Sequence, residues 1–375
     1  MKVAIVHEKF TVYAGSERVV DQLHLLWPDA PIFTTVCDSD ALGPVLRDAD
    51  VRPNERLQKL YRGGDRYAHL LPLLPIAMSR IDLSGFDLVV TSHHAFANRV
   101  RPPDGVPTVA YVHTPARWLW EASTRRHEIG GTIGRAGLGA FAATQRHADH
   151  NAAQRMTALV ANSSYVVQRI RRWWGRDASV VAPPVDTAFY TPDPSRPRGD
   201  YFLVAGRLVP YKRPELAVAA ATRAGVRLVV AGDGRARAAV EAAAGPTVEI
   251  LGRVDDDQLR DLYRGCRALL FPGVEDFGIM PVEAQACGAP VIALALGGAL
   301  DTVVPGSTGV LYGGSTDTEH VDTLARVLED FDDAAFDSSV IRTHAERFAP
   351  ERFRAGFAAA VAGAAGRLAP GAPGS

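Results

Sequence analysis

Short apolar runs recur along the chain and alternate with longer segments of mixed polarity. An apolar run bounded by turn residues is typical of a buried strand, and an amphipathic stretch between two runs is typical of a helix. Because the two kinds of segment alternate, we expect an α/β protein with mostly parallel sheets. The strands are predicted at Lys2–Val6, Ile32–Thr35, Leu88–Ser92, Thr108–Val112, Leu159–Ala161, Tyr201–Ala205, Arg227–Ala231, Val248–Leu251, Ala268–Phe271, Pro290–Ala293 and Gly309–Tyr312.

The pattern also predicts two domains. The chain has 375 residues, which is too long for one ordinary domain and sufficient for two. A segment rich in proline and charge, Thr191–Gly199, has the composition of a linker. We therefore expect one domain over residues 1–195 and a second over residues 196–347.

Composition excludes several classes of protein. The net charge of −1 gives no argument for binding to nucleic acid. No apolar run approaches the ~20 residues that a membrane-spanning helix needs. The first residues, MKVAIVHEKF, become charged too early for a signal peptide. We expect a cytoplasmic protein.

The stretch Leu269–Thr308 carries the clearest chemistry. A buried strand is followed by an acidic loop, and a helix is predicted to begin near Ile279. The start of such a helix, at Phe277, Gly278 and Ile279, exposes backbone N–H groups that suit a pyrophosphate. Glu275 could accept hydrogen bonds from sugar hydroxyls, and Glu283 from a ribose, because ionised carboxylates are pure acceptors. The alternative is that Glu275 caps the helix and Glu283 is a solvated helix residue.

The residue pattern of this stretch is a more specific indicator of a protein family than its two glutamates are. The pattern E-D-F-G-I-x-P-V-E-A-Q-A-C-G-x-P-V-I-A, followed by G-G-A-L-D-T-V, resembles the E-x7-E region of retaining GT-B glycosyltransferases (group 1, family 4). The likeness is greatest to mannosyltransferases that build bacterial surface polysaccharides, and matching motifs extend from Val3 to about Phe353. The resemblance implies two doubly wound Rossmann-like domains facing a cleft. It also implies a C-terminal helix over residues 348–367 that packs back on the first domain.

A second group of candidate donor contacts follows the strand Tyr201–Ala205. Arg207 and Lys212 lie five residues apart on one loop. Two cations beside a backbone turn suit a diphosphate, the arginine through forked hydrogen bonds and the lysine as a point charge. The alternative is a basic loop in solvent. The resemblance further places Arg253 and Val254 beside the nucleotide base.

The first domain contributes Gly15 and His113. Gly15 precedes a predicted helix start near Ser16, so its backbone could contact the donor phosphate. The related family often has two glycines in this loop, whereas Ala14 precedes Gly15 here. His113 ends a strand, and the carboxyl edge of a parallel sheet lines the ligand crevice in such folds. The resemblance makes His113 a donor-sugar contact near the reacting carbon.

Aromatic and basic residues in the first domain have two interpretations. Trp118 and Trp120 could form a wall for the acceptor or pack within their loop. The segment Leu57–Met78 could be a core helix interrupted by prolines, which we favour, or a contact for a lipid-linked acceptor. Four arginines flank Trp173-Trp174 and could face a membrane or belong to a solvated helix end; they are Arg169, Arg171, Arg172 and Arg176.

The expected function is retaining transfer of a hexose, mannose from GDP-mannose, to a glycan or lipid-linked acceptor in cell-envelope or exopolysaccharide synthesis. His113, Glu275, Arg207 and Lys212 form the expected catalytic set. We expect no cofactor and no metal, because fixed cations and a helix N-terminus can stabilise the departing diphosphate. The pair Asp38-x-Asp40 has metal-like spacing but lies outside a donor loop.

Several alternatives stay open. The donor could be a UDP-hexose or a deoxyhexose nucleotide. The enzyme could be a nucleotide-sugar epimerase or a phosphorylase, or the chain could be a non-catalytic nucleotide-sugar-binding protein. A peripheral contact with the inner membrane face stays open beside the cytoplasmic location.

Overall fold

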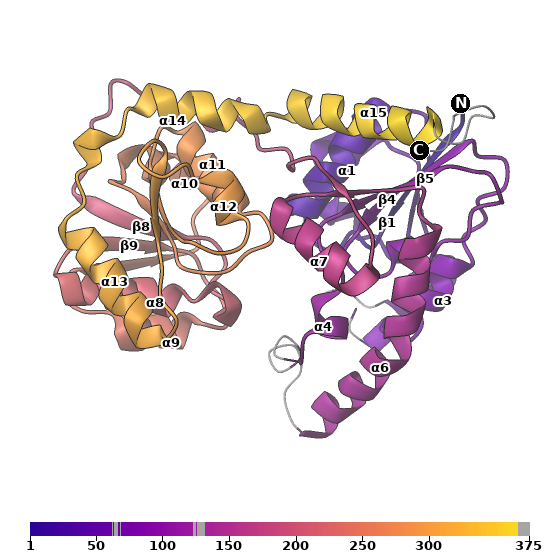
Figure 1. Ribbon diagram of the computed structural model, residues 1–375, viewed down its shortest axis with the longest axis horizontal. Helices are drawn as coiled ribbons and strands as arrows, with labels where there is room; N and C mark the ends of the chain where they lie inside the picture. The colour runs from indigo at the N-terminus through magenta and orange to yellow at the C-terminus, as the bar shows by residue number, and fades with distance from the viewer. Residues whose placement is uncertain (62, 64–66, 68, 123–124, 126–131, 367–375) are drawn as a thin grey trace. The chain divides into compact units, whose positions relative to one another are not determined.

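The computed structural model of the protein describes residues 1–61, 63, 67, 69–122, 125 and 132–366. The chain forms two compact units, each of which is built around its own parallel sheet (Figure 1). Unit 1 comprises Met1–Pro184 together with the C-terminal segment from Glu351, and unit 2 comprises Val185–Pro350. The segment Thr191–Gly199, expected as a linker, lies in unit 2, where Thr191 accepts two hydrogen bonds from Arg264.

The sheet of unit 1 has seven strands, and every pair of neighbours runs parallel. In spatial order they are β3 (Val51–Pro53), β2 (Ile32–Thr34), β1 (Val3–His7), β4 (Leu88–His93), β5 (Thr108–Val112), β6 (Ala158–Ala161) and β7 (Ser179–Val180). The five predicted strands of this unit are all present. The two edge strands, β3 and β7, were not predicted, because each is very short and carries no apolar run.

Helices cover both faces of this sheet. The α-helices are α1 (Gly15–Leu26), α2 (Glu55–Leu60), α3 (Leu74–Ser79), α4 (Arg117–Trp120), α6 (Thr132–Arg155), α7 (Ser164–Trp174) and α15 (Pro350–Gly366), and the short 3₁₀ turns are η1 (Ser39–Ala41), η2 (Pro44–Leu46) and η4 (Ala97–Arg99). On one face, α1 and α15 pack over β1, β4 and β5. Phe353 and Phe357 of α15 are buried against Tyr111 of β5.

Two helix predictions in unit 1 need correction. The first helix begins at Gly15, and its N-cap is Ala14 rather than Ser16. The carboxylate of Glu17 accepts the Ala14 N–H instead, so the end of the helix is closed from its third position. The segment Leu57–Met78 is not one helix: it contains the end of α2 and most of α3. Arg62 and Arg66, two basic residues of this segment, lie outside the described residues.

The aromatic pair near the end of α7 belongs to the core. Trp174 is fully buried and Trp173 nearly so. Arg169 is also buried, with its guanidinium over the rings of Tyr165 and Trp173. The hypothesis that this aromatic cluster faces a membrane is therefore wrong for these three side chains, whereas Arg171 and Arg172 remain exposed.

The sheet of unit 2 has six parallel strands. In spatial order they are β10 (Val248–Gly252), β9 (Arg227–Ala231), β8 (Tyr201–Ala205), β11 (Leu269–Phe271), β12 (Val291–Leu294) and β13 (Gly309–Tyr312). All six were predicted within one or two residues at each end. The order reverses direction at β8, as it does at β1 in unit 1, so both sheets are doubly wound.

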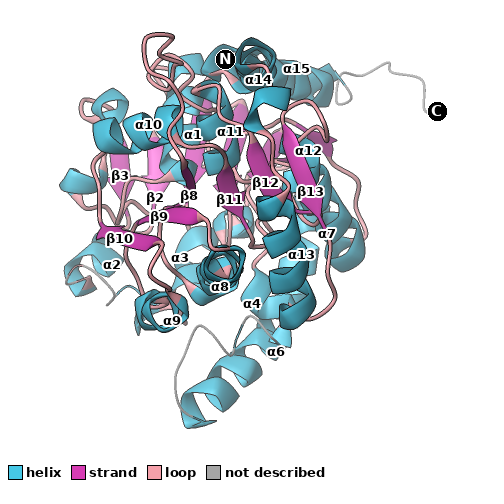
Figure 2. Cartoon of the chain, turned by 90° about the vertical axis from the view of Figure 1, so that its left-hand side faces the viewer, coloured by secondary structure: helices cyan, strands magenta, loops and turns pink. Residues whose placement is uncertain are grey.

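The helices of unit 2 lie on both faces of the sheet. They are α8 (Pro214–Ala224), α9 (Arg237–Ala243), α10 (Asp256–Gly265), α11 (Ile279–Ala286), α12 (Ala299–Thr302), α13 (Asp317–Glu329) and α14 (Ser338–Ala345), with 3₁₀ turns η5 (Pro210–Lys212), η6 (Asp333–Ala335) and η7 (Glu346–Phe348). Helices α8 and α13 pack together over one face (Figure 2). Their small residues, such as Ala217 and Ala221, allow close approach to the apolar strands.

Candidate functional site

An ion pair joins two of the predicted donor contacts in unit 2. The Nζ atom of Lys212, at the end of η5, lies 3.0 Å from Oε1 of Glu275, in the loop after β11. Both side chains are 18% exposed, so the pair is shielded but still reachable from solvent. Burial lowers the pKa of Lys212, but the Glu275 carboxylate and the Tyr211 phenol outweigh it, so the pKa lies above its ordinary value. The ammonium group is therefore firmly charged.

Glycines bring the loops of this edge into contact. A Cβ atom at Gly273 would stand 2.7 Å from the Cα atom of Lys212, so only glycine lets the loop after β11 pack on η5. A Cβ atom at Gly298 would stand 2.3 Å from the backbone of Phe277, and the Gly298 N–H donates to the Glu275 carbonyl at 2.9 Å. The sequence G-G after β12 is thus needed to hold the acidic loop in place.

The acidic loop leads into the N-terminus of α11. Gly278 is the N-cap, with φ of +91°, and no side chain of the described residues caps this end of the helix. Its first N–H groups are therefore available to an anion. Phe277 is buried with its ring 5.6 Å from that of Phe348, so Phe277 offers its backbone rather than its side chain. The hypothesis that Glu275 caps the helix is not supported, because its carboxylate pairs with Lys212.

Arg207 lies beside this pair and is exposed, and its charge acts on Lys212 by lowering the lysine pKa. Glu283 lies further along α11 and is only 5% exposed. Its Oε2 accepts a hydrogen bond from the buried Tyr263 hydroxyl at 3.2 Å. The solvated-helix alternative for Glu283 is therefore wrong, while its ribose role stays a prediction.

Two further predicted contacts follow β10. Arg253 is exposed and Val254 is half-buried, directly after Gly252, whose φ is +77°. The Gly252 carbonyl accepts a hydrogen bond from Gly232 N–H, which ties this strand end to that of β9. Arg253 and Val254 thus lie at the same carboxyl edge of the sheet as Arg207, Lys212 and the acidic loop.

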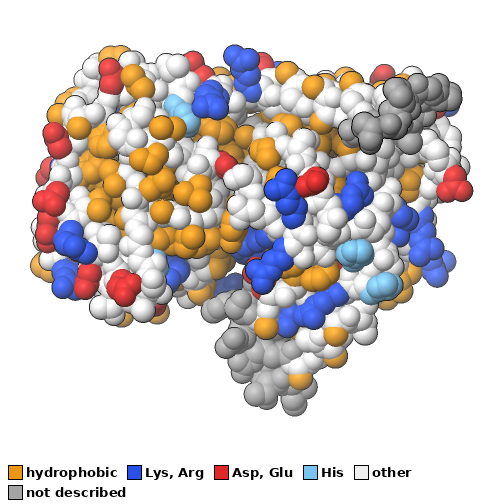
Figure 3. Space-filling model, viewed as in Figure 1, with side chains coloured by type: hydrophobic (Ala, Val, Ile, Leu, Met, Phe, Trp, Pro, Cys, Tyr) orange, Lys and Arg blue, Asp and Glu red, His pale blue; other side chains and the backbone are white. Residues whose placement is uncertain are grey.

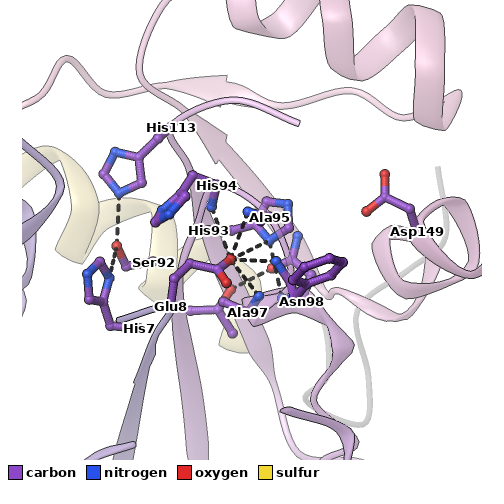
Figure 4. A network of polar contacts seen from close by, with 12 residues as sticks. His7, Glu8, Ser92, His93, His94, Ala95, Ala97, Asn98, His113 and Asp149 are labelled. Carbon is purple, nitrogen blue, oxygen red and sulfur yellow. Dashed lines mark hydrogen bonds and ion pairs between the residues drawn. The ribbon is translucent and has the colours of Figure 1, made fainter. Parts of the chain in front are cut away.

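A chain of hydrogen bonds reaches His113 in unit 1 (Figure 4). The Nε2 atom of His113 lies 2.8 Å from Oγ of Ser92, and the same Oγ lies 3.1 Å from Nδ1 of His7. Nε2 of His7 lies 3.2 Å from Oε1 of Glu17 on α1. The ends of β1, β4 and β5 and the first turn of α1 are therefore connected through side chains. We call these four residues the histidine relay.

The charges of the relay define its proton positions. Burial raises the pKa of Glu17, but the hydrogen bond from His7 and its charge outweigh this and lower the pKa to about 2. Glu17 is thus an acceptor and His7 Nε2 a donor. Burial, with help from His94 and His7, lowers the pKa of His113 to about 3, so its ring is neutral.

Two proton patterns satisfy these bonds. With His7 neutral, the Ser92 hydroxyl donates to His7 Nδ1 and accepts from His113 Nε2, which leaves His113 Nδ1 as an acceptor. With His7 protonated, the chain reverses and His113 Nδ1 carries the hydrogen. Among the described residues no hydrogen bond reaches His113 Nδ1, so this atom is open to a ligand.

A buried carboxylate organises the loop beside the relay. Oε1 of Glu8 accepts hydrogen bonds from four consecutive backbone N–H groups, those of His94, Ala95, Phe96 and Ala97, at 3.3, 2.8, 2.6 and 2.7 Å. Glu8 is 1% exposed. Figure 4 shows this carboxylate in the middle of the loop that follows β4. One buried side chain therefore holds the backbone of this loop in place.

Two other residues from the prediction are placed as follows. Gly15 is the first residue of α1 and lies two positions from Glu17 of the relay. Trp118 stacks on Phe141 with ring centroids 6.0 Å apart, and Trp120 stacks on Trp173 at the same distance. The two tryptophans therefore pack within unit 1, and the ring neighbours of His113 are Tyr111 and His94.

Sequence reasoning missed His7, Glu8, Glu17 and Ser92 as members of this site. The signal was present, since the argument that singled out His113 applies equally to His7 and His93-His94, which end β1 and β4. Glu8 was assigned only to a loop, because its partners are backbone groups some 86 residues away in the chain.

Among the described residues, no group of three or more His, Cys, Asp or Glu side chains is arranged to hold a metal ion. Asp38, from the pair with metal-like spacing, accepts a hydrogen bond from the Tyr61 hydroxyl at 2.7 Å. Within the described part of the chain, no helix has both the length and the apolar character required to cross a bilayer.

Comparison with known protein families matches both parts of the chain. Residues 13–189 match the glycosyltransferase family 4, and residues 192–336 match the glycosyl transferases group 1. Two curated relatives are D-inositol 3-phosphate glycosyltransferases. That of Mycolicibacterium smegmatis is 34% identical over 46% of this chain and 45% of its own length. That of Frankia alni is 32% identical over 40% of this chain and 44% of its own. The chain thus spans about half the length of these relatives.

Solved structures extend the likeness of fold to the whole chain. Anabaena Alr3699/HepE in complex with UDP has a TM-score of 0.68 at 18% identity and covers 97% of this chain and 100% of its own. Sucrose-phosphate synthase from Thermosynechococcus elongatus has a TM-score of 0.66 at 18% identity and covers 98% of each chain. The chain therefore has the GT-B fold, and its two parts are similar to glycosyltransferase family 4 and to the glycosyl transferases group 1, respectively.

Proposed function

We propose that the protein is a retaining glycosyltransferase that takes a hexose from a nucleotide sugar and transfers it to an acceptor hydroxyl. The observation that carries this proposal is the Lys212–Glu275 pair beside the uncapped N-terminus of α11. A fixed cation and free N–H groups suit a diphosphate, and an adjacent carboxylate suits sugar hydroxyls. The match of both parts of the chain to glycosyltransferase families supports the same assignment.

Each residue has a distinct part in this scheme. Lys212 and Arg207 stabilise the negative charge that develops on the diphosphate as the bond from the anomeric carbon to its oxygen breaks. Glu275 holds the sugar hydroxyls. The acceptor hydroxyl attacks from the face that the diphosphate leaves, forms the new carbon–oxygen bond, and passes its proton to the departing phosphate oxygen. The scheme uses no cofactor and no metal.

His113 contributes from unit 1 through its Nδ1 atom. With His7 neutral, this atom accepts a hydrogen bond from a donor-sugar hydroxyl. Gly15 contacts the donor phosphate through its backbone, while Arg253 and Val254 lie against the base and Glu283 against the ribose. The roles of His113, Arg253 and Val254 follow the resemblance of the sequence, whereas those of Gly15 and Glu283 follow from the predicted helix starts and from the acceptor chemistry of a carboxylate.

For the donor we propose GDP-mannose, on the likeness of the acidic stretch to bacterial mannosyltransferases, with a glycan or lipid-linked acceptor in cell-envelope synthesis. A UDP-hexose is the second candidate, because Anabaena Alr3699/HepE has the same fold and its structure was solved with UDP-glucose. An inositol phosphate joins the acceptors to be tested, because the curated relatives are D-inositol 3-phosphate glycosyltransferases. We place the protein at the cytoplasmic side of the membrane.

A donor screen tests the proposal directly. The purified chain is heated with GDP-mannose, UDP-glucose, UDP-N-acetylglucosamine or a deoxyhexose nucleotide, and its melting temperature is recorded. A donor at about 100 times its Kd stabilises the folded state by about 2.7 kcal/mol. Only the true donor is expected to give the full shift of the melting temperature. Because the scheme needs no metal, the shift should be unchanged when EDTA is added.

Product analysis then separates the alternatives. A transferase releases the nucleoside diphosphate and makes a glycoside whose anomeric configuration matches that of the donor. An epimerase would convert the sugar without any acceptor, and a pyridoxal-phosphate phosphorylase would show cofactor absorbance. Donor binding without turnover on glycan, lipid-linked or inositol-phosphate acceptors would leave only the binding-protein alternative. An inverted product would contradict the retaining assignment.

A further inference from the structure

A cavity lies in unit 1, separate from the residues proposed to bind the donor. Its volume is about 350 Å³, and residues of α3, η4 and α6 form its walls. Pro75 and Ile76 come from α3, Arg99 from η4, Arg101 from the turn that follows, and His147 and Arg155 from α6. The wall combines three arginines with an apolar rim. None of the residues discussed for donor binding lines this cavity.

Arg99 is the most deeply placed of the three arginines. Arg99 is only 6% exposed, and one terminal N–H of its guanidinium donates a hydrogen bond to the Gln145 carbonyl at 3.0 Å. Its Nε is buried and has no hydrogen-bond partner within the described residues. A buried guanidinium with an unused donor is costly unless a ligand or water completes it.

The charges around the cavity are unbalanced. No Asp or Glu is among its described lining residues. Burial lowers the pKa of Arg155, and the charge of Arg101 lowers it further. Burial is also the largest influence on Arg99 and lowers its pKa; the Asp149 carboxylate comes next and raises it, and Arg155 lowers it again. The carboxylates of Asp149 and Glu8 act in the opposite direction on Arg99. Asp149, however, already accepts the indole N–H groups of Trp120 and Trp174 at 2.9 and 2.8 Å.

The remaining arginines are accessible. Arg101 and Arg155 are exposed, and Arg155 ends α6 with one N–H donated to the Asn151 carbonyl at 3.2 Å. In Figure 3, Lys, Arg and His side chains gather over the part of unit 1 where α6 lies. Guanidinium groups stay ionised at any ordinary pH, so mutual repulsion persists until an anion enters.

We propose that this cavity is a phosphate-binding site. Three guanidinium groups around a pocket of this size suit the oxygens of a phosphate or diphosphate, which arginine binds through paired hydrogen bonds. Arg99 provides a buried positive charge held in place by the Gln145 carbonyl, and the exposed Arg101 and Arg155 provide the donors that reach the anion. The proposal does not depend on glycosyl transfer, because binding can be measured without turnover.

The phosphate has two conceivable sources. Ile76, which lines the cavity, is 48% exposed, and Leu73, three residues before it in the chain, is 43% exposed. A pocket that binds an anion beside exposed apolar groups suits an amphiphile, such as a lipid with a phosphate headgroup. A soluble phosphate or diphosphate would satisfy the arginines alone. The experiment below separates the two.

The test measures pyrophosphate binding by calorimetry in the full chain carrying Lys212→Ala/Arg207→Ala, which removes both cations assigned to the donor site in unit 2. In this background we compare Arg101→Gln/Arg155→Gln with a matched control, Arg171→Gln/Arg227→Gln, which removes the same charge from two exposed arginines elsewhere. The pocket variant should bind at least ~10-fold more weakly, and the control should bind as the parent does. Melting temperatures check that all the chains are folded.

A second arm uses vesicles of equal parts phosphatidylglycerol and phosphatidylcholine, beside vesicles of phosphatidylcholine alone. If the ligand is a lipid headgroup, only the anionic vesicles sediment the protein, the pocket variant stays in solution, and pyrophosphate competes. If the ligand is soluble, pyrophosphate binds through the pocket and neither vesicle does. Equal pyrophosphate affinity in the pocket variant and its control, or binding to neither ligand, would overturn the proposal.

Discussion

The ammonium group of Lys212 lies 3.0 Å from the Oε1 atom of Glu275, so the charges of these two predicted donor contacts neutralise each other. Under the proposed function, a diphosphate that enters this site would compete with the carboxylate for the lysine. The carboxylate would then be released toward the sugar. The pair would thus link recognition of the phosphate to recognition of the hexose.

Removing either cation should impair catalysis. We expect Lys212→Ala and Arg207→Ala each to lose roughly 2–4 kcal/mol of transition-state stabilisation, measured as kcat/KM with the cognate nucleotide sugar. Arg227→Ala is the matched control, since this exposed arginine of the same unit pairs with Asp200 and Glu249. Wild-type rates in both cation variants, together with strict dependence on added magnesium, would refute the metal-free scheme.

The two glutamates should give different defects. Glu275→Gln should lower turnover and alter the choice of donor sugar while free nucleotide still binds. Glu283→Gln should weaken binding of the free nucleoside diphosphate about tenfold, and Tyr263→Phe should do the same to a smaller degree, because the tyrosine hydroxyl orients the carboxylate. Calorimetry with the free nucleotide measures both.

Glu283 also has a purely structural alternative. If it only satisfies Tyr263 in the core, Glu283→Gln will lower the melting temperature and leave nucleotide affinity unchanged. Equal losses of nucleotide affinity in the Glu275 and Glu283 variants would contradict the division of labour between them.

The histidine relay predicts a role for a residue that touches no substrate. Ser92→Ala removes the hydroxyl that fixes the proton on His113, so turnover should fall roughly tenfold. His113→Ala should lower turnover further, and binding of the free nucleotide should survive in both. Ser92→Thr, which keeps a hydroxyl, is the control and should recover most of the activity. Full turnover in His113→Ala would reduce the relay to a packing feature.

Three histidines at the ends of β4 and β5 predict acid sensitivity. Burial is the largest cause that lowers the pKa of His93, His94 and His113, each to about 3. In the unfolded chain they would bind protons below about 6.5, so unfolding takes up protons and stability falls as the pH drops from 6.5 toward 3. The slope could reach roughly 4 kcal/mol per pH unit for three such groups.

Urea unfolding between pH 5 and 7.5 checks this prediction. His94→Gln should flatten the slope by about a third, whereas His147→Gln, at an exposed position of α6, should leave it unchanged. Glu17 adds a further loss of stability below about pH 4.5, because its folded-state pKa is lowered to about 2. A stability that stays constant from pH 7.5 to pH 5 would contradict the conclusion that these three imidazoles stay neutral in the folded chain.

The sequence was informative where the physics is local. Central strands are apolar runs, and all eleven predicted strands are present. The acidic loop and the start of α11 could be read from one continuous stretch. The edge strands β3 and β7 could not be predicted in this way. Strand β3 contains Arg52 and Pro53 and β7 has only two residues, so neither gives a periodic pattern, and each forms only by pairing with its neighbouring strand.

Long-range side-chain pairing was beyond sequence reasoning. Nothing near Glu8 indicates that its partners are the amides of residues 94–97, and nothing near Lys212 indicates Glu275. The burial of Arg169 and Trp174 was misjudged for a similar reason. Arginines around two tryptophans look like a surface patch until the fold places the aromatic rings against α6 and β5.

The carboxylate of Glu8 has a consequence for motion. One oxygen holds four successive amide protons, so all four should exchange with heavy water together, and only when the carboxylate withdraws. A loop between a strand and a 3₁₀ turn would ordinarily exchange within seconds, residue by residue. Here residues 94–97 should behave as one slow block, with protection like that of the strand before it. The surface that presents His94 is then rigid before any ligand arrives.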